Sequence, residues 1–388
     1  MSIVFTAGTV VAAGQAAPGW LTVDGDRITA VGHEEPPATT ERRDLGADAV
    51  LVPGFVDQHV HGGAGAAFTG GDPAEALRAI RFHRAHGTTT SVASLVAAGP
   101  AELRRDVAAL AELVTDGELA GVHLEGPWLA AARCGAHDPA QLRDPDPVEL
   151  APLLASGVVR MVTLAPERAG ALAAIRQIVD AGAVAAVGHT DASYALTRDA
   201  IAAGARVGTH LFNAMAPVHH REPGPAIALM EDPRVVVELV TDGLHVHPAL
   251  WTHVLAAAGA ERVAAVTDAM AAAGMPDGDY HLGALQVTVT DRVARVAGEP
   301  TGPIAGSTAT TADLFALIVA HAEAPRAEAL LRAAAMTATT PARVLGLDGA
   351  VGALAPGLRA DLVVLGPDLR VREVLRAGRV VEAVPLPG

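Results

Sequence analysis

The sequence predicts an α/β protein that combines a (β/α)8 TIM-like barrel with a small β-sandwich domain built from both termini. From Pro53 onward, short apolar runs alternate with alanine-rich helical stretches, which is typical of a parallel sheet with crossover helices. Seven or eight such units follow one another over roughly 290 residues, which suits a barrel of about 250 residues with insertions. The two ends of the chain show strand patterning instead.

The strand-like runs at the two ends are short and separated by turn signals. They lie at residues 2–5, 19–23, 27–31, 49–52, 360–365 and 370–381. We therefore expect residues 1–52 and 350–388 to pair in one small β domain and residues 53–349 to form the barrel.

The expected barrel strands are apolar and the segments between them have helical composition. The strands are expected at 51–57, 88–95, 121–124, 158–164, 184–188, 206–210, 235–240 and 263–266. Helices are expected at 73–86, 100–115, 169–181 and 194–203. The runs 282–289 and 295–300 predict a β insertion near 280–300, close to the end of the barrel.

Composition limits the classes of function. Of the 388 residues, 51% are hydrophobic but only 3% are aromatic, so alanine, valine and leucine must fill the core. Binding a nucleic-acid backbone needs clustered cations, and the net charge of −15 argues against such a partner.

The single cysteine, Cys134, allows no intrachain disulfide. An apolar N-terminus without a basic leader, and no run long enough to span a bilayer, predict a cytoplasmic protein without a membrane partner.

The strongest chemical signal is His59-Val60-His61, which follows the first expected barrel strand. Residues i and i+2 of a strand share a face, so two imidazoles at a strand end could reach one ion. Taken alone, the pair would more often be two ordinary histidines in a glycine-rich loop.

Four later residues of types that commonly bind metals make a metal site the better interpretation. Glu125 closes an apolar run before Gly-Pro, His189 and His210 each end another run, and Asp268 ends a fourth. Each has a plainer alternative, a surface acid or a structural histidine. Together with the histidine pair they lie where barrel strands converge at their C-terminal ends. Imidazole and carboxylate ligands suit zinc, iron or manganese.

These residues resemble the metal-dependent amidohydrolase superfamily and, within it, the N-acetylglucosamine-6-phosphate deacetylase family. The most specific blocks are Thr-His-Leu-Phe-Asn-Ala-Met at 209–215 and Arg-Glu-Pro-Gly at 221–224. Many superfamily members bridge two metals with a carboxylated lysine, but this chain has no lysine. The other matching blocks are 53–62, 123–127, 135–137, 188–192, 242–245, 266–269, 305–307 and 352–362.

The resemblance implies hydrolysis of N-acetyl-D-glucosamine 6-phosphate to D-glucosamine 6-phosphate and acetate, in amino-sugar catabolism or recycling. It implies that Glu125, His189 and His210 hold the main divalent metal and that His59 and His61 could complete a second site, while Asp268 is counted with the metal residues. Zinc is the expected metal, with iron or another transition metal as the alternative and one or two ions per subunit. Asp268 would move a proton from water to the leaving amine. His137 would stabilise the developing oxyanion.

The resemblance also implies a set of substrate-binding residues and a homodimer. Arg221 would bind the phosphate, either in its own subunit or across the interface, which the sequence leaves open. Its alternative is an ion pair with Glu222 or Asp232. The whole set is Ala136, His137, Asn213, Ala214, Arg221, His245, Ile304, Ala305 and Gly306.

Other functions and other residues remain open at this point. Another N-acyl amidohydrolase or a deaminase would explain the metal residues but not the 209–224 blocks. A silent scaffold would have lost ligands, and a sugar-phosphate-binding regulator would need a DNA-reading module. Among the remaining residues, His123 shares the face of Glu125 and could support it. Cys134, Trp128, His83, His86, His219, His220 and His247 are expected to be bystanders or structural residues.

Overall fold

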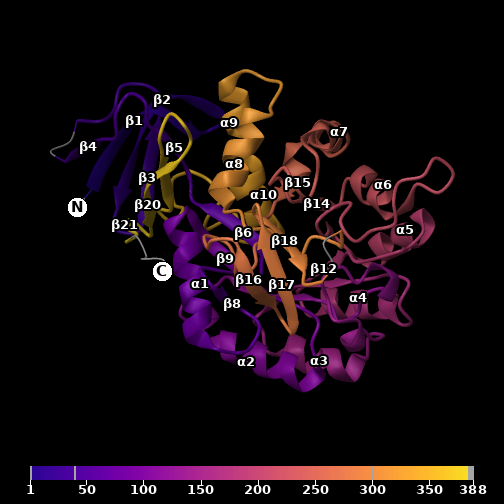
Figure 1. The fold of residues 1–388 in the computed structure, drawn as a ribbon. Helices are drawn as coiled ribbons and strands as arrows, with labels where there is room; N and C mark the ends of the chain where they lie inside the picture. Colours follow the sequence, from indigo (N-terminus) through magenta and orange to yellow (C-terminus); the bar gives the residue numbers. More distant parts are fainter. Residues whose placement is uncertain (1, 39–40, 299–300, 383–388) are drawn as a thin grey trace. The chain divides into compact units, whose positions relative to one another are not determined.

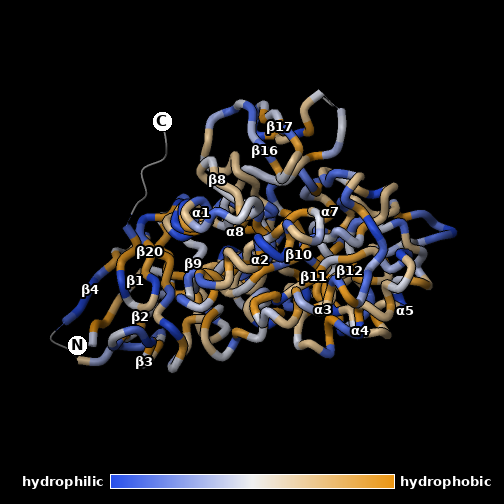
Figure 2. The backbone as a smooth tube through the Cα atoms, turned by 90° about the horizontal axis from the view of Figure 1, so that it is seen from below, coloured by the Kyte–Doolittle hydropathy of each residue, from blue (hydrophilic) through white to orange (hydrophobic). Residues whose placement is uncertain are grey.

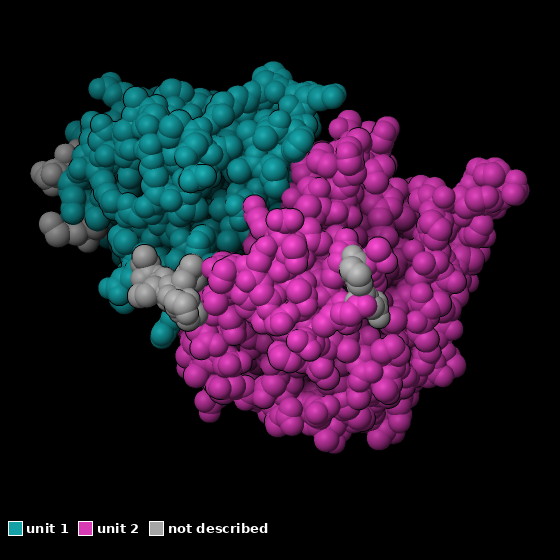
Figure 3. Space-filling view, in the orientation of Figure 1, with its two compact units in different colours: residues 1–57, 81–90, 310–385 teal, residues 58–80, 91–309, 386–388 magenta. Residues whose placement is uncertain are grey.

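The computed structural model describes residues 2–38, 41–298 and 301–382, and these divide into two units (Figure 3). Among the described residues, unit 1 holds residues 2–57 without 39–40, residues 81–90 and residues 310–382. Unit 2 holds residues 58–80 and 91–309. The predicted domain boundaries, 1–52 with 350–388 for the small β domain and 53–349 for the barrel, differ from these units and stay a prediction.

Eight strands form the predicted parallel barrel (Figure 1). Their order in the sheet is β15-β14-β13-β12-β11-β10-β9-β6, which is also their order along the chain read backward. The ring is nearly closed, because His61 donates its N–H to Ala269 O at 2.8 Å and Asp268 donates its N–H to His59 O at 2.9 Å. The strands are β6 Phe55–Val60, β9 Thr88–Leu95, β10 Gly121–Glu125, β11 Val159–Leu164, β12 Val184–Val187, β13 Val207–Gly208, β14 Val236–Leu239 and β15 Val263–Ala265.

Helices follow the barrel strands in alternation, as predicted. In α2, Pro100 occupies the first turn and the Glu102 carboxylate accepts the Gly99 N–H at 3.1 Å, so the first turn is capped. The bounds are α1 Pro73–Ala85, α2 Pro100–Thr115, α3 Pro147–Ala155, α4 Ala171–Asp180, α5 Tyr194–Ala203, α6 Gly224–Glu231, α7 Pro248–Ala258, α8 Thr311–Ala320, α9 Arg326–Ala334 and α10 Thr340–Val344. Among the described residues, no helix is both long and apolar enough to cross a bilayer.

The barrel strands carry mainly valine, alanine, leucine and threonine and few aromatic side chains, as the low aromatic content requires. All residues of β9 and β10 are buried, and Figure 2 shows hydrophobic colours along β10, β11 and β12. Strands buried on both faces carry continuous apolar runs rather than alternation. This explains why the sequence located these strands well.

One expected strand, 51–57, is wrong as a single element, because it divides at Gly54 between two sheets. Residues before it form β5, Val50–Pro53, and those after it form β6. A Cβ at Gly54 would lie 2.3 Å from Thr89 Oγ1, and the Gly54 N–H donates to Asp361 O at 2.8 Å. Only glycine fits this close approach, and an apolar run alone carries no sign of the division.

The small β domain is one mostly antiparallel sheet built from both ends of the chain, as predicted. The strand order is β21-β20-β19-β5-β1-β2-β3, with β4 beside β1. A bridge between Arg27 and Arg359 brings β3 against the segment that leads into β19, so the sheet curves around its apolar cluster. The strands are β1 Ser2–Ala12, β2 Gln15–Asp24, β3 Arg27–Gly32, β4 Arg42–Asp44, β5 Val50–Pro53, β19 Leu362–Leu365, β20 Val371–Arg376 and β21 Arg379–Val380.

The predicted insertion is a three-stranded antiparallel sheet of β16 Gly278–Leu282, β17 Leu285–Thr290 and β18 Val293–Val296. The end of the predicted run, at 299–300, lies outside the described residues. The sheet packs its buried side into an apolar cluster that also contains Ala136 and Met270. The insertion therefore supports the loops that carry His137 and Asp268. A further short pair, β7 Gly62–Gly63 and β8 Ala66–Ala67, follows β6.

Candidate metal centre

The six predicted ligand residues come together at the C-terminal end of the barrel. His59 lies on β6, His61 follows it, and Glu125 is the last residue of β10. The other three, His189, His210 and Asp268, follow β12, β13 and β15. All six are buried.

Three of these residues end their strands in a backbone conformation that non-glycine residues rarely adopt. The φ angles of His189, His210 and Asp268 are 47°, 27° and 49°. A left-handed residue reverses the direction of the chain, so these strands stop and the side chains turn over the end of the barrel. Such strain, roughly 1–2 kcal/mol per residue, is a feature of functional sites.

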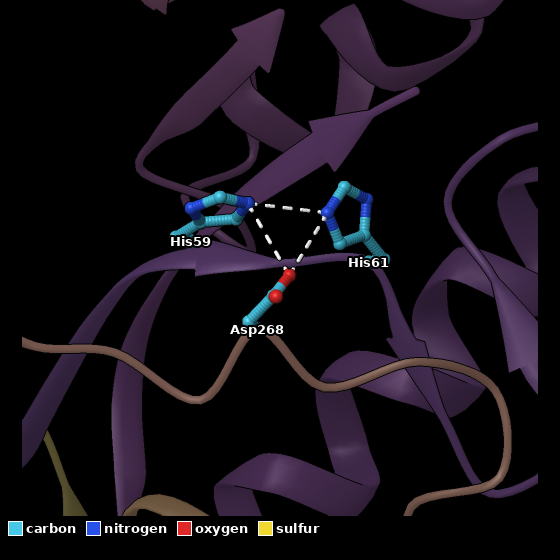
Figure 4. A group of neighbouring side chains, drawn as sticks. All are labelled: His59, His61 and Asp268. Carbon is cyan, nitrogen blue, oxygen red and sulfur yellow. Dashed lines mark hydrogen bonds and ion pairs between the residues drawn. The ribbon is translucent and has the colours of Figure 1, made fainter. Parts of the chain in front are cut away.

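His59, His61 and Asp268 form one group of possible ligands, and Figure 4 shows the three side chains pointing toward one another. The two Nε2 atoms lie 3.1 Å apart. Asp268 Oδ1 lies 3.4 Å from His59 Nε2 and 3.3 Å from His61 Nε2. We call these three residues the histidine-pair group.

Glu125, His189 and His210 form a second group, which we call the Glu125 group. Glu125 Oε1 lies 3.1 Å from His189 Nε2 and 2.9 Å from His210 Nε2. The two Nε2 atoms lie 3.0 Å apart. The other oxygen, Glu125 Oε2, lies 3.1 Å from His61 Nε2, so this carboxylate stands between the two groups.

The spacing of these atoms fits a divalent metal. In a tetrahedral centre with metal–ligand bonds of about 2.0 Å, neighbouring ligand atoms lie about 3.3 Å apart. The separations in the histidine-pair group are 3.1, 3.3 and 3.4 Å. The donors are imidazole nitrogens and carboxylate oxygens, which suit zinc and iron. Both groups therefore have the chemistry and spacing to hold an ion.

The hydrogen bond at Nδ1 decides which tautomer each imidazole adopts, and therefore whether its Nε2 can bind a metal. His61 Nδ1 donates to Ser94 O at 3.2 Å and His189 Nδ1 donates to Arg133 O at 2.8 Å. A carbonyl can only accept, so in each neutral ring Nδ1 carries the proton and Nε2 offers a lone pair.

His137 has the opposite arrangement. Its Nδ1 accepts the Ala97 backbone N–H at 3.1 Å, so in the neutral ring Nε2 carries the proton. That Nε2 lies 3.3 Å from Glu125 Oε2, close enough for His137 to be counted with Glu125 and His189 as a possible metal group. The tautomer makes His137 a hydrogen-bond donor into the cavity rather than a ligand.

The electrostatics of the two groups differ. Burial alone would lower the pKa of His61, but hydrogen bonds and charge from Asp268 and Glu125 raise it to about 9. Burial lowers the pKa of His189 to about 4, although Glu125 opposes this. Burial would raise the pKa of both carboxylates, yet the neighbouring imidazoles hold the pKa of Glu125 and Asp268 well below the usual range.

A buried chain of hydrogen bonds lies behind the centre. The Val60 N–H donates to Ser94 Oγ at 3.1 Å, and Ser94 Oγ is hydrogen-bonded to His123 Nδ1 at 2.9 Å. His123 Nε2 is hydrogen-bonded to Thr163 Oγ1 at 2.8 Å. Its ring stacks edge-on against His59 with centroids 4.6 Å apart. His123 therefore supports the centre from beneath, as the sequence suggested.

A cavity of about 590 Å³ opens above the centre, a size that suits a small-molecule site. The insertion contributes an apolar wall with Leu282, Leu285 and Val296. Most predicted site residues line the cavity, namely His61, Glu125, Ala136, His137, His189, His210, Asn213, Ala214, His245, Asp268, Ile304 and Gly306. Within the described part of the chain, His59, Ala305 and Arg221 are not among the lining residues: the first two are buried, and Arg221 is exposed.

His245 is held in place from one side only. The Asp242 carboxylate accepts from His245 Nδ1 at 2.7 Å and from the His245 backbone N–H at 2.9 Å. His245 Nε2 is buried and has no partner among the described residues. His247 instead caps α7, because its Nδ1 accepts the Ala249 N–H at 3.2 Å. Arg221 Nη1 lies 2.7 Å from His220 Nε2.

Two contributors were not foreseen from the sequence. Glu238, on β14, accepts a hydrogen bond from His59, and the Ala97 N–H fixes the tautomer of His137. The signal for Glu238 is present, because it is a lone acid in the apolar run Val-Val-Val-Glu-Leu-Val. The contribution of Ala97 comes from the backbone and leaves no mark on residue types.

Comparisons with known proteins point to one family. The sequence profile of the amidohydrolase family matches residues 50–381. The chain is 36% identical over 374 residues to the N-acetylgalactosamine-6-phosphate deacetylase of Escherichia coli O157:H7, covering 93% of this chain and 96% of that protein. It is 35% identical over 337 residues to the N-acetylglucosamine-6-phosphate deacetylase of Vibrio furnissii, covering 85% and 82%.

A solved structure is more similar still. It is an Asp-to-Ala variant of N-acetyl-D-glucosamine-6-phosphate deacetylase from Mycobacterium smegmatis, in complex with N-acetyl-D-glucosamine-6-phosphate. The two chains are 55% identical with a TM-score of 0.95, and the match covers 98% of this chain and 100% of that one.

Proposed function

The chain belongs to the amidohydrolase family and, within it, to the N-acetylglucosamine-6-phosphate deacetylases, and from this premise we propose that it hydrolyses N-acetyl-D-glucosamine 6-phosphate to D-glucosamine 6-phosphate and acetate. One observation carries the proposal. Imidazoles and carboxylates with metal-ligand spacing lie at the base of a cavity, in a chain that is 55% identical to a deacetylase solved with this sugar phosphate.

We propose zinc as the metal, with iron as the alternative. One ion would be held by the Glu125 group, and a second by the histidine-pair group. A bound divalent metal would supply the Lewis acidity that polarises an amide carbonyl and acidifies water. The remaining chemistry comes from side chains of the protein.

Asp268 and His137 have the properties that the reaction needs. The pKa of Asp268 is held low, so its carboxylate is available to take a proton from water and pass it to the leaving amine. Its side chain lines the cavity. His137 presents Nε2–H to the same cavity, where it would donate a hydrogen bond to the oxyanion that develops on the acetyl carbonyl.

The substrate would lie between the metal centre and His245. The buried, unpartnered Nε2 of His245 requires a partner, and a phosphate or hydroxyl oxygen of the sugar would provide one. Asn213 and Ala214 line the same side of the cavity. Arg221 is exposed within its own chain and would bind phosphate in a homodimer, which stays a prediction, as does the cytoplasmic location.

A second candidate substrate is N-acetyl-D-galactosamine 6-phosphate. The relative from Escherichia coli, at 36% identity, is named for that sugar. The two sugars differ only in the orientation of the 4-hydroxyl, which would be read by side chains around the sugar rather than by the metal centre. Both sugars therefore belong in the test.

The test is acetate release by zinc-loaded protein from both sugar phosphates, unphosphorylated N-acetylglucosamine and an N-acetyl amino acid. We expect preference for the phosphorylated glucosamine substrate, loss of activity on chelation, and recovery on adding zinc. Asp268→Asn should retain zinc in the Glu125 group but lose roughly 10²–10⁴-fold in kcat. Arg221→Ala should raise KM for the phosphorylated sugar far more than for the unphosphorylated one. Metal-dependent release from the amino acid alone would contradict the proposed substrate.

A further inference from the structure

Glu238 is a buried carboxylate that no part of the proposed reaction uses. It lies on β14 and is 0% exposed. A buried acid is unfavourable unless it is paired and hydrogen-bonded, so the groups around it show what it does.

Three donors surround this carboxylate. Gln58 Nε2 donates to Oε1 at 2.8 Å, and His59 Nδ1 donates to Oε2 at 3.0 Å. The His210 backbone N–H donates to Oε2 at 3.3 Å. Glu238 therefore contacts an imidazole of the histidine-pair group and the backbone of a residue in the Glu125 group.

The hydrogen bond to His59 has a chemical consequence. A carboxylate that accepts from Nδ1 places the proton of the neutral ring there and leaves the Nε2 lone pair free. That Nε2 lies 3.1 Å from His61 Nε2 and 3.4 Å from Asp268 Oδ1, where an ion would sit. The comparison with His137 shows that the opposite tautomer also occurs in this cavity.

We propose that Glu238 is a positioning residue that holds His59 in the metal-binding tautomer and thereby sets the metal affinity of the histidine-pair group. The inference rests on the proposed function only for the presence of a metal centre. Carboxylates behind ligating histidines typically change metal affinity by about 10–100-fold. His59 donates to a carboxylate, whereas His61 and His189 donate to backbone carbonyls, and a carboxylate partner makes an imidazole a more basic ligand.

A purely structural role is the competing explanation, because Glu238 also joins β14 to β6 through Gln58. The test must therefore separate loss of metal affinity through His59 from loss of stability. The variants are Glu238→Gln, His59→Ala and the double variant. The matched control is Asp232→Asn, the same change of acid to amide at a buried residue that precedes β14 and pairs with Arg234 at 2.7 Å.

Zinc affinity is measured by competition with a chelator at one pH, and zinc content by elemental analysis after dialysis. We expect Glu238→Gln to weaken zinc binding about 10–100-fold at the histidine-pair group. The double variant should bind zinc no more weakly than His59→Ala alone, because Glu238 acts through His59. Asp232→Asn should lower the melting temperature while zinc affinity stays at the wild-type value.

Three results would overturn the inference. They are wild-type zinc affinity in Glu238→Gln, additive losses in the double variant, and zinc affinity that does not change in His59→Ala.

A second measurement needs no variant to fold, because ¹⁵N-histidine spectra of the wild-type protein report the tautomer directly. In the metal-free protein, a neutral His59 ring, measured above its raised pKa, with its proton on Nε2 would also overturn the inference. Failure of the sugar-phosphate assay would contradict the proposed function but leave these metal measurements unaffected.

Discussion

The histidine-pair group and the Glu125 group lie side by side, but the protein holds them in different ways. The first is carried largely by one buried strand, β6, and is supported from behind by Glu238 and by the Ser94–His123 chain. In the second, the histidines follow two different strands with left-handed backbones, and His210 Nδ1 has no partner among the described residues. Both imidazoles of the first group therefore have an outer partner at Nδ1, whereas in the second group only His189 does, through the Arg133 carbonyl.

The histidines of the two groups also differ in proton occupancy. In the first group, Asp268 and Glu125 raise the pKa of His61 to about 9 against the effect of burial. In the second group, burial lowers the pKa of His189 to about 4, although Glu125 and Asp268 raise the pKa of His210. At neutral pH the first group therefore holds protons that an ion must displace, and His189 is already neutral. Two sites that share one carboxylate should respond differently to substitution and to pH.

The largest effect should come from Glu125→Gln. This carboxylate contacts histidines of both groups, so its loss should weaken the binding of an ion at each group. Loss of a group that only hydrogen-bonds to a ligand lowers metal affinity or activity ~10–100-fold, and turnover should fall by more than that in Glu125→Gln. Zinc content by elemental analysis and kcat with the sugar phosphate measure this. A variant that keeps one ion at wild-type affinity would show that one of the groups does not depend on Glu125.

The strand ends of the site could be predicted from the sequence, because each candidate ligand closes an apolar run that a buried parallel strand requires. His59, Glu125, His189, His210 and Asp268 were all found in this way. The tautomers could not be predicted, because they depend on which backbone groups lie behind each ring after folding. The Ala97 N–H and the Ser94 carbonyl are backbone groups, which do not depend on the type of residue. They take part in the site only because the fold places them behind these rings.

The fold shows the same limit. The barrel and the terminal β domain followed from periodicity, but the division of 51–57 at Gly54 depends on a contact with Thr89 that is distant in sequence. The short strand β4 has three exposed residues, Arg-Arg-Asp, and therefore shows no apolar pattern. The proposed contact of Arg221 with phosphate would involve a second chain, so the pattern of one sequence carries no sign of it.

An intermediate effect should appear in the pH dependence of metal binding. Because His61 must lose its proton, zinc affinity at the histidine-pair group should rise with pH up to about 9, by up to roughly tenfold per unit for each proton displaced. At the Glu125 group, His189 is neutral throughout pH 6.5–9 and displaces no proton, so only His210, whose pKa Glu125 and Asp268 raise, adds a pH dependence there. Zinc titrations at pH 6.5, 7.5 and 8.5, with proton release measured by calorimetry, test the difference.

The stability of the metal-free protein should also depend on pH through His61 of the histidine-pair group. The folded pKa of His61 is raised above its unfolded value of about 6.5, so its contribution is complete below pH 6.5 and is lost as pH rises through about 9. The increase in melting temperature on adding zinc should therefore be larger at pH 8.5 than at pH 6.5. Equal increases would contradict the assignment of raised proton affinity to the first group.

The smallest effect should come from the loop that holds His189. The Arg133 carbonyl accepts from His189 Nδ1, and the Arg133 guanidinium pairs with Asp191 at 2.7 Å. The two side chains are 32% and 49% exposed, so the pair should contribute only about 0.2–1 kcal/mol. Asp191→Asn should thus weaken zinc binding at the Glu125 group by about 1.4- to 5-fold, which chelator competition can measure. A loss above tenfold would mean that this loop positions His189 as firmly as Glu238 positions His59, and the contrast between the two groups would then lie in their protonation alone.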